Sequence, residues 1–304
     1  MENAELPFVS IIICTLNRKI MLKKCLDSIF RLDYSKSKYE VIVVDGGSTD
    51  GTRTLKNDFS RVKFIIEDRL GLAHARNLGV DHAKGSIIAY TDDDCIVDEA
   101  WIKNLVYGFH VSRSIIGVGG PVYPINPKII PEKFLVKAAL GLFDDGERLK
   151  IADRGIITSN CAFKMEAFKV AKFDDRLGTT RRGGLLISGE DTDFCRTLMN
   201  AGCQLLYTPK AKVYHHVPTS KIRASYILKR AVHNAISYQR SLLKWECANT
   251  YMPRVKALRY IIGQIVQGLF SFLRKRSFST CYKLITSITA LFVCLTFMDK
   301  LTFN

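Results

Sequence analysis

The stretch Gly85-Ser-Ile-Ile-Ala-Tyr-Thr-Asp-Asp-Asp94 is a run of small and apolar residues that ends in three adjacent aspartates. Adjacent carboxylates repel one another, so a fold that holds three of them together needs a compensating cation. Carboxylate oxygens are the hard ligands that Mg²⁺ and Mn²⁺ prefer, and such an ion commonly shares its remaining positions with water and substrate phosphates. The stretch therefore favours a buried strand with a metal–diphosphate site at its carboxyl end. The alternative is a solvated acidic turn that caps the next helix.

The first half of the chain alternates between two hydrophobic patterns. Continuous apolar runs, typical of strands buried on both faces, occupy Phe8–Cys14, Tyr39–Asp45, Val62–Ile66 and Ile87–Tyr90. Apolar residues at helical spacing occupy Lys19–Arg31, Gly71–Ala83 and Glu99–His110. Strands that alternate with helices predict an α/β domain with a mostly parallel sheet. Further along, we expect a helix over Asp191–Ala201 and short strands between residues 204 and 213.

Polar loops follow three of the expected strands. They are Cys14-Thr-Leu-Asn-Arg18, Asp45-Gly-Gly-Ser-Thr-Asp-Gly51 and Asp92-Asp-Asp94. Ligands of parallel sheets bind beyond the carboxyl ends of the strands, so we expect these loops to converge at one edge. Asp45 can accept a hydrogen bond from a base or ribose, although a generic turn would also fit its sequence. Arg76 could face a diphosphate from the following helix, and a surface arginine would give the same pattern.

Two later motifs carry titratable side chains. Glu190-Asp191 opens the expected helix after a glycine-rich loop, where a carboxylate is a good N-cap. The functional interpretation is a general base that takes a proton from an attacking hydroxyl. His215 and His216 end an expected strand and could complete a metal shell or contact phosphate, while a structural or surface histidine pair is the simpler alternative.

The chain has 304 residues and a formal net charge of +16, which indicates attraction to a polyanion: a membrane surface, a nucleic acid or a phosphorylated substrate. Its nine scattered cysteines form no Cys-x-x-Cys pair and are typical of free thiols in a reducing cytosol. The acidic start of the chain lacks the basic region of a secretion signal. We expect a cytosolic protein that contacts an anionic partner.

The sequence changes character near residue 220, so we expect a catalytic domain over residues 1–219 and a basic, apolar helical region over 220–304. Two apolar segments, Ala257–Leu273 and Tyr282–Met298, flank Arg274-Lys-Arg276. Neither is a clean span, because the first contains glutamines and the second is shorter than the roughly 20 residues that a span needs. We expect an interfacial helix pair with basic residues at the lipid headgroups. A re-entrant hairpin or helices packed on the domain itself are the alternatives.

Seven stretches, taken in order, resemble the family 2 glycosyltransferases of the GT-A fold. They are Val9-Ser-Ile-Ile-Ile-Cys-Thr-Leu-Asn-Arg18, Val43-Val-Asp-Gly-Gly-Ser-Thr-Asp-Gly-Thr52, Gly71-Leu-Ala-His-Ala-Arg-Asn-Leu-Gly79, Tyr90-Thr-Asp-Asp-Asp-Cys95, Thr158-Ser-Asn-Cys-Ala-Phe163, Gly189-Glu-Asp-Thr-Asp193 and Pro209-x-Ala-x-Val-Tyr-His215. The resemblance implies a Rossmann-like α/β fold with a mostly parallel mixed sheet and a nucleotide-diphospho-sugar donor.

The resemblance also implies a role for individual residues. The nucleotide sugar would be bound by Thr15, Asn17, Arg18, Asp45, Ser48, Arg76, Asp92 and Asp93. Mn²⁺ or Mg²⁺ would be held by Asp93, Asp94 and His215. Asp191 would be the catalytic base of an inverting transfer, with Glu190 and Asn160 on the acceptor side. The family often has Asp-Asn-Gly-Ser or Asp-Asp-Gly-Ser where this chain has Asp45-Gly-Gly-Ser48, which leaves the identity of the bound base open.

Together these patterns predict an inverting glycosyltransferase at the cytoplasmic face of a membrane. Its donor would be a nucleotide-diphosphate sugar, with UDP favoured, and its acceptor a growing cell-surface glycan or a lipid-linked glycan. A sugar nucleotidyltransferase is one alternative, but such enzymes tend to have a glycine-rich basic loop where this chain has Thr15-Leu-Asn-Arg-Lys19. A non-catalytic basic protein that binds membrane or nucleic acid is another. The basic residues accompany apolar segments, so we expect no nucleic acid partner.

Overall fold

The computed structural model describes residues 6–68, 71–130, 137, 140–153, 155–178, 188–223, 225–227, 229, 230, 233, 234 and 288. The chain divides into two compact units. The first comprises Met1–Ile130, Gly141–Thr180 and Glu190–Val217, and the second comprises Pro131–Leu140, Arg181–Gly189 and Pro218–Asn304. The described part of the second unit includes a short 3-10 helix, Thr219–Ile222. The expected interfacial helices lie outside the described residues, and the boundary at residue 219 stays a prediction.

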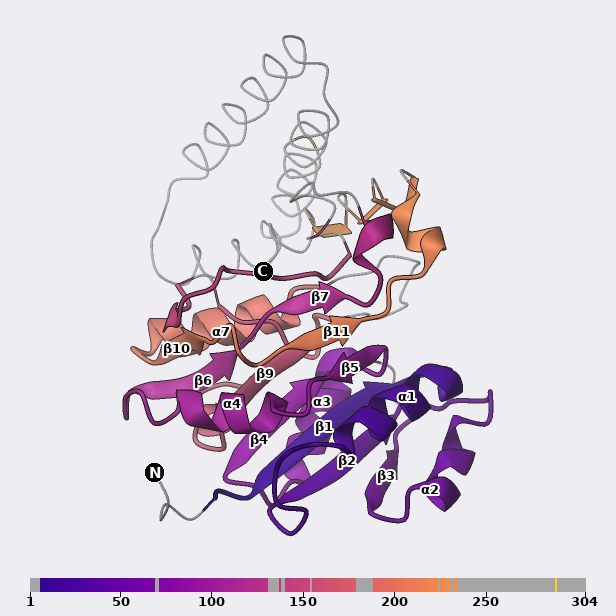
Figure 1. The fold of residues 1–304 in the computed structure, drawn as a ribbon, viewed down its shortest axis with the longest axis horizontal. Helices are drawn as coiled ribbons and strands as arrows, with labels where there is room; N and C mark the ends of the chain where they lie inside the picture. The colour runs from indigo at the N-terminus through magenta and orange to yellow at the C-terminus, as the bar shows by residue number, and fades with distance from the viewer. Residues whose placement is uncertain are drawn as a thin grey trace, which may run out of the picture. The chain divides into compact units, whose positions relative to one another are not determined.

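The first unit is built on a mixed sheet of eight strands in the order β3-β2-β1-β4-β9-β6-β10-β8 (Figure 1). The strands are β1 (Val9–Thr15), β2 (Tyr39–Asp45), β3 (Val62–Ile66), β4 (Ile87–Thr91), β6 (Ile115–Gly119), β8 (Lys150–Ile151), β9 (Asn160–Lys164) and β10 (Gln204–Tyr207). The first four are parallel to one another, whereas β9 runs antiparallel between β4 and β6. This arrangement confirms the predicted α/β fold with a mostly parallel sheet.

Helices cover both faces of this sheet, which explains why its central strands are apolar throughout. The helices are α1 (Lys19–Ile29), α2 (Leu55–Asp58), α3 (Leu72–Asp81), α4 (Trp101–Gly108), α6 (Ala167–Val170) and α7 (Glu190–Asn200), with 3-10 turns at Thr52–Thr54 and Pro127–Ile129. In Figure 1, α1 and α4 lie on the near face and α3 on the far face.

The core beneath α3 and α7 fixes the position of both helices. Phe163, Phe168, Phe173 and Phe194 form a set of stacked and edge-on rings there, with Phe173 and Phe194 only 4.5 Å apart between centroids. Helix α3 approaches β1 closely, because a Cβ added at Gly79 would lie 2.5 Å from Cγ2 of Ile12. Helices α3 and α7 are therefore held against the same sheet.

A second sheet of three short strands has the order β5-β11-β7. It consists of β5 (Cys95–Val97), β7 (Val122–Pro124) and β11 (Val213–His215). In register, Tyr214 of β11 lies between Ile96 of β5 and Tyr123 of β7. These three side chains are partly exposed. The side chains of Cys95 and His215, which pair with each other at the next position along the strands, are buried. Successive residues of a strand point to opposite faces, so the small sheet has a buried face and an outer face.

Candidate active site

The carboxyl ends of β2, β1 and β4 meet at one edge of the large sheet, as expected for adjacent parallel strands. Asp45 ends β2 and Thr15 ends β1, and Asp92, Asp93 and Asp94 directly follow β4. Hydrogen bonds join these loops. The amide of Asn17 donates to Oγ of Ser48 at 2.8 Å, and the amide of Thr49 donates to Oδ1 of Asn17 at 2.8 Å. The structure therefore brings together the three loops that the sequence placed at one edge.

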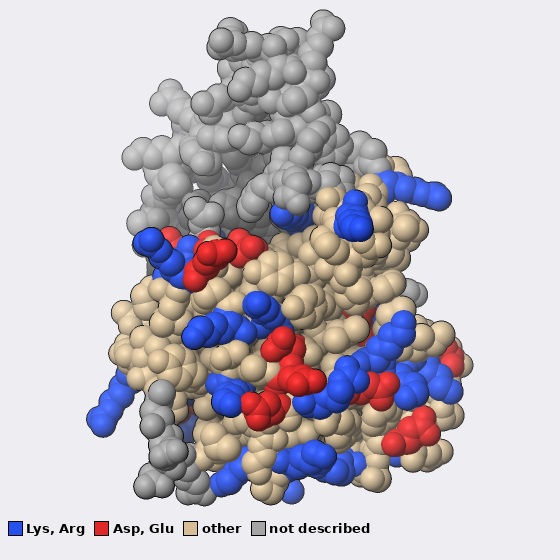
Figure 2. Space-filling view, in the orientation of Figure 1, with Lys and Arg blue, Asp and Glu red and all other residues tan. Residues whose placement is uncertain are grey.

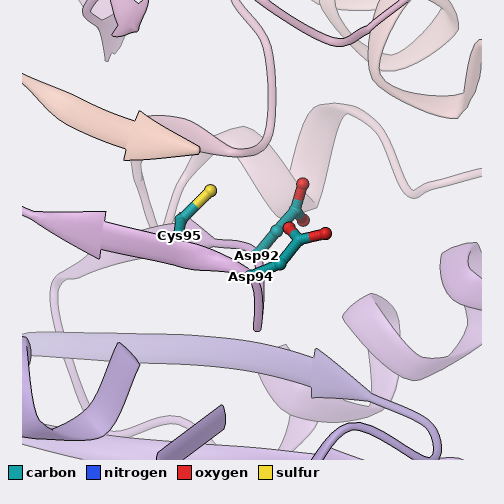
Figure 3. A group of neighbouring side chains, drawn as sticks. All are labelled: Asp92, Asp94 and Cys95. Atoms are coloured by element: carbon teal, nitrogen blue, oxygen red, sulfur yellow. The ribbon is translucent and has the colours of Figure 1, made fainter. Parts of the chain in front are cut away.

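Asp92 and Asp94 form the part of the acidic cluster that could hold a metal ion. Figure 3 shows their carboxylates directed to the same side, beside the thiol of Cys95. One ligand atom from each of the three residues lies within 4.8 Å of the others. Burial raises the pKa of Cys95 well above its usual value, so its thiol stays protonated and is a poor ligand. The two carboxylates are the better donors.

Asp93 and Asp94 are both more buried than Asp92. Their side chains are 8 % and 9 % exposed, against 40 % for Asp92. Oδ2 of Asp93 accepts a 2.7 Å hydrogen bond from Oγ1 of Thr15, and Oδ1 accepts one of 3.1 Å from Nη1 of Arg18. Burial raises the pKa of Asp93 to about 7, although Arg18 opposes this shift. Both oxygens of Asp93 thus have protein partners, as do both oxygens of Asp94, and the role of Asp93 as a metal ligand stays a prediction.

Arg18 supplies the positive charge that compensates the aspartates. Its Nη1 contacts Oδ2 of Asp94 as well as Asp93. Its side chain is 41 % exposed. Burial alone would lower the pKa of Arg18, but the carboxylates of Asp93 and Asp94 outweigh this effect and raise it. Arg18 therefore remains charged and screens the aspartates from one another.

Asp45 has no exposed surface. Its Oδ1 accepts a 2.9 Å hydrogen bond from the amide of Ser48, and its Oδ2 accepts one of 3.1 Å from Nε of Arg53. Arg53 was not among the expected site residues, and nothing in its local sequence distinguishes it from a surface arginine. Ser48 and Arg53 both bind the carboxylate of Asp45, so Arg53 belongs to any binding site that includes Asp45.

Arg76 joins two acidic elements of the site. Nη1 of Arg76 lies 2.6 Å from Oε1 of Glu190, and Nη2 lies 3.6 Å from Oδ1 of Asp92. Its guanidinium also lies 5.6 Å from the ring centroid of Phe173. Burial would lower the pKa of Arg76, but Glu190 and Asp92 reverse that effect and raise it. Oε2 of Glu190 is buried and has no partner among the described residues.

Asp191 lies in the first turn of α7 beside Glu190. Its Oδ1 accepts a 2.7 Å hydrogen bond from the amide of Thr192. Burial raises the pKa of Asp191 to about 6, and the neighbouring carboxylate of Glu190 adds to the shift. A carboxyl group with such a pKa is ionised at neutral pH and is a stronger base than an ordinary aspartate, as general-base catalysis requires.

His215 closes the cluster from β11. Its Nε2 lies 3.3 Å from Oδ1 of Asp94, and its buried Nδ1 has no partner in the described part of the chain. The amide of His216 donates to the backbone oxygen of Asp94 at 2.8 Å, which ties β11 to the acidic loop. The structure thus brings His215, but not the side chain of His216, to the aspartates.

Asn160 is fully buried at the start of β9. Its Nδ2 donates to the backbone oxygens of Pro121 and Ala211, at 2.7 Å each. Its Oδ1 accepts a 2.8 Å hydrogen bond from Nε1 of Trp101. These bonds give Asn160 a structural place, and its role on the acceptor side stays a prediction.

Comparisons with known proteins agree with this geometry. Residues 10–171 match the model of "Glycosyl transferase family 2". "Glycosyltransferase AglE" of Haloferax volcanii is 42 % identical over 33 % of this chain and 34 % of its own length. "Glucosyl-dolichyl phosphate glucuronosyltransferase" of the same organism is 26 % identical, over 68 % of each chain. A dolichyl-phosphate-linked sugar transferase of Methanococcus voltae is 25 % identical over 76 % of this chain and 71 % of its own.

Two solved structures share the fold. The mannosyltransferase PcManGT of Pyrobaculum calidifontis, in complex with GDP-Man and Mn²⁺, has a TM-score of 0.62, with 20 % identity over 94 % of this chain and 87 % of that chain. GalNAc-T7, with UDP, GalNAc and Mn²⁺, has a TM-score of 0.60, with 18 % identity over 85 % and 51 %. The family match covers more than half of the chain, and the chain therefore belongs to glycosyl transferase family 2.

Proposed function

We propose that this protein is an inverting glycosyltransferase that moves a sugar from a nucleoside-diphosphate donor to an acceptor hydroxyl. The observation that carries the proposal is the convergence of Asp92 and Asp94 with the buried Arg76–Glu190 pair beside Asp191. One side of this arrangement suits a metal-bound diphosphate, and the other supplies a base. Family membership supports the same reaction class.

Asp92, Asp94 and His215 would hold the divalent ion. Two carboxylates and an imidazole are a donor set that suits Mn²⁺ or Mg²⁺. The buried, unpartnered Nδ1 of His215 supports the fit, because a group of the bound substrate can complete its hydrogen bonding. When bound, the ion would neutralise the charge that develops on the leaving diphosphate. The Mn²⁺ ions and nucleotides named with the two structural neighbours support this choice.

On the donor side, Asp45 with Ser48 and Arg53 would bind the nucleoside. Arg76 would supply positive charge at the diphosphate end of the site, because the carboxylates of Glu190 and Asp92 keep its buried guanidinium protonated. Thr15, Asn17 and Arg18 would shape the loop that faces the donor. UDP stays the favoured nucleotide of this proposal, and GDP is the competing choice.

On the acceptor side, Asp191 would take the proton from the attacking hydroxyl. The raised pKa of Asp191 supports this role, because a general base is most effective when its pKa lies near the pH at which the enzyme works. Attack on the anomeric carbon from the side opposite the diphosphate would break the donor bond and invert that centre. Glu190 would orient Asp191 and the acceptor through its bond to Arg76.

The acceptor that we propose is a lipid-linked glycan. Two relatives are named for transfer to sugars on dolichyl phosphate. Among the described residues, no helix is both long and apolar enough to cross a membrane. The basic and apolar sequence of residues 220–304 supports peripheral binding at the cytoplasmic face, where a polyprenyl-type carrier would present its sugar.

Calorimetric titration of UDP, GDP, dTDP and CMP into the purified protein, with and without Mn²⁺, tests the proposal. We expect Mn²⁺-dependent binding of one nucleoside diphosphate, lost in Asp94→Ala and retained in Asp191→Asn. The matched control is Asp27→Asn, an aspartate on the exposed side of α1 that pairs with Lys23. If no nucleotide binds under any metal condition, the proposed function is wrong.

A further inference from the structure

A cavity of about 580 Å³ lies on the first unit, apart from the candidate active site. It is bounded by the end of α1, strand β5, the start of α4 and strand β11, with Arg31, Asp33, Ile96, Asp98, Glu99 and Tyr214 among its lining residues. None of these residues belongs to the donor or base machinery described above. A volume in this range is typical of small-molecule sites.

The cavity and the metal centre use alternate residues of β11. His215 faces the aspartates while Tyr214 lines the cavity, and on β5 both Ile96 and the buried Val97 at the end of the strand border the cavity. Side chains of successive strand residues point to opposite faces. The cavity is therefore on the outer face of the small sheet, and a molecule bound there would not occupy the donor site.

The floor of the cavity is extended by a second aromatic ring. Tyr123 on β7 is in register with Tyr214, and their ring centroids are 6.3 Å apart with the planes tilted by 42°. Both tyrosines are half-buried, so part of each ring is accessible to a ligand. The two rings and Ile96 thus form a partly exposed apolar row across the small sheet.

Carboxylates border this row on both sides. Asp33, Asp98 and Glu99 line the cavity, and the carboxylates of Asp144 and Glu147 are close enough to Tyr123 to help burial raise the pKa of its hydroxyl. In Figure 2, acidic side chains gather over the region of β5 and α4, beneath an uncharged stretch over β7 and β11. The lining has one guanidinium, that of Arg31, against three carboxylates, and Lys103 outside the lining pairs with Asp33 at 2.8 Å. With Lys103 counted, this group of charges is still net negative, which disfavours phosphates and other anions.

We infer that this cavity is a carbohydrate-binding site that holds a neutral part of the glycan acceptor away from the point of transfer. The rings of Tyr214 and Tyr123 would pack against the apolar faces of sugar rings, as aromatic rings do with other apolar groups. The carboxylates and Arg31 would exchange hydrogen bonds with the sugar hydroxyls, and charged partners strengthen such bonds. The choice of carbohydrate rests on the proposed function, because the row itself specifies only a neutral ligand with apolar faces and many hydroxyls.

The site predicts sugar binding that needs neither donor nor metal. The probes are neutral oligosaccharides of glucose, mannose and N-acetylglucosamine, added to the full chain without nucleotide or Mn²⁺ and followed by saturation-transfer NMR and titration. We expect at least one to bind, and Tyr214→Ala to weaken its binding by roughly 10-fold, the loss expected for one aromatic partner. Tyr214→Phe should bind like the wild type, because the ring face is kept. Tyr107→Ala is the control, since Tyr107 is 48 % exposed on α4 and lies outside the cavity lining.

The outcomes separate this inference from the proposed function. Asp94→Ala and Asp191→Asn should bind the oligosaccharide as the wild type does, whatever they do to nucleotide binding and transfer. If nucleotide binds with Mn²⁺ but no oligosaccharide binds up to about 10 mM, the carbohydrate site is wrong and the proposed function stands. Unchanged binding in Tyr214→Ala, or displacement of the sugar by inorganic phosphate, would also overturn it.

Discussion

Nη1 of Arg76 donates a 2.6 Å hydrogen bond to Oε1 of Glu190, a residue 114 positions further along the chain. Both side chains are almost fully buried, at 4 % and 8 % exposure. The bond connects α3, which follows β3, to the first turn of α7, where Asp191 lies. A buried ion pair of this kind fixes orientation more than it adds stability, because desolvation offsets much of the attraction. Its main effect is to position Asp191 relative to the aspartates.

Removal of one partner of this pair should destabilise the protein strongly. Arg76→Ala leaves Glu190 as an uncompensated buried charge, for which we expect a loss of about 3–5 kcal/mol in the free energy of unfolding. Urea denaturation followed by circular dichroism measures the change. Lys23→Ala is the control, because the exposed Lys23–Asp27 pair should contribute at most about 1 kcal/mol. Equal losses in the two variants would contradict this account.

Asp191→Asn should separate binding from transfer. Loss of the base is expected to lower the turnover number by roughly 10²- to 10⁴-fold, while the affinity for nucleotide and Mn²⁺ stays unchanged. Single-turnover transfer from radiolabelled donor measures the rate, and calorimetry measures the affinity. Glu166→Gln, which changes an exposed carboxylate in the same unit, is the control. A normal rate in Asp191→Asn would assign the base elsewhere.

The transfer rate should rise with pH through about 6. Only ionised Asp191 can accept a proton, and burial together with Glu190 raises its pKa to about 6. The ionisation of Asp191 should raise the transfer rate but lower the stability of the fold. The folded-state pKa is above that of a free aspartate, so this group stabilises the fold at low pH and the contribution is lost as pH rises through about 6. Asp191→Asn should therefore gain stability over the wild type at pH 7. A rate independent of pH from 5 to 7 would contradict the assignment.

The three aspartates should differ in metal binding. We expect Asp92→Asn and Asp94→Asn to lose measurable Mn²⁺ binding, because their carboxylates are the paired donors. Asp93→Asn should retain it, weakened by about 10-fold, as expected of a residue that acts by holding Arg18 and Thr15. Electron paramagnetic resonance of free Mn²⁺ gives the affinities. Complete loss in Asp93→Asn with retention in Asp92→Asn would reverse the assignment.

Asn160→Ala should affect stability rather than donor binding. The substitution leaves two backbone oxygens and the Trp101 indole without their buried partner, and each such loss costs about 1–3 kcal/mol. We expect a clear fall in the urea midpoint and an unchanged affinity for nucleotide. Asn104→Ala, which removes a single bond to the backbone oxygen of Lys210 near the surface, is the milder comparison. An acceptor role would instead show as a raised KM with normal stability.

The sequence predicted the parallel half of the fold well. The bounds of β2 and β3 agree with the structure, and those of β1, β4 and α1 differ at the ends by one or two residues. Buried parallel strands need continuous apolar runs, which are visible locally. The strands β5, β6, β7, β8 and β9 were not predicted as strands, because their pairing depends on partners far away in sequence.

The candidate site was predictable only in part. Ligands of parallel sheets bind beyond the carboxyl ends of the strands, and this rule predicted that Thr15, Asp45 and the aspartates lie together. The bonds of Arg53 to Asp45 and of Arg76 to Glu190 form only in the folded chain and could not be predicted from the local sequence. No local signal separates the three aspartates, because their chemistry is the same and they lie in a turn. Asp93 and Asp94 are both nearly buried and both contact Arg18, and Asp92 is the most exposed of the three.

The small sheet limits how this enzyme can change over evolution. A single inserted residue in β11 would exchange the positions of His215 and Tyr214, so that a phenol would face the aspartates and an imidazole the outer cavity. An insertion or deletion within this strand would therefore disturb both faces at once, whereas a substitution can change one face alone. Related chains with a different specificity should keep the length of β5 and β11 unchanged and vary in the loops that join them to the rest of the unit.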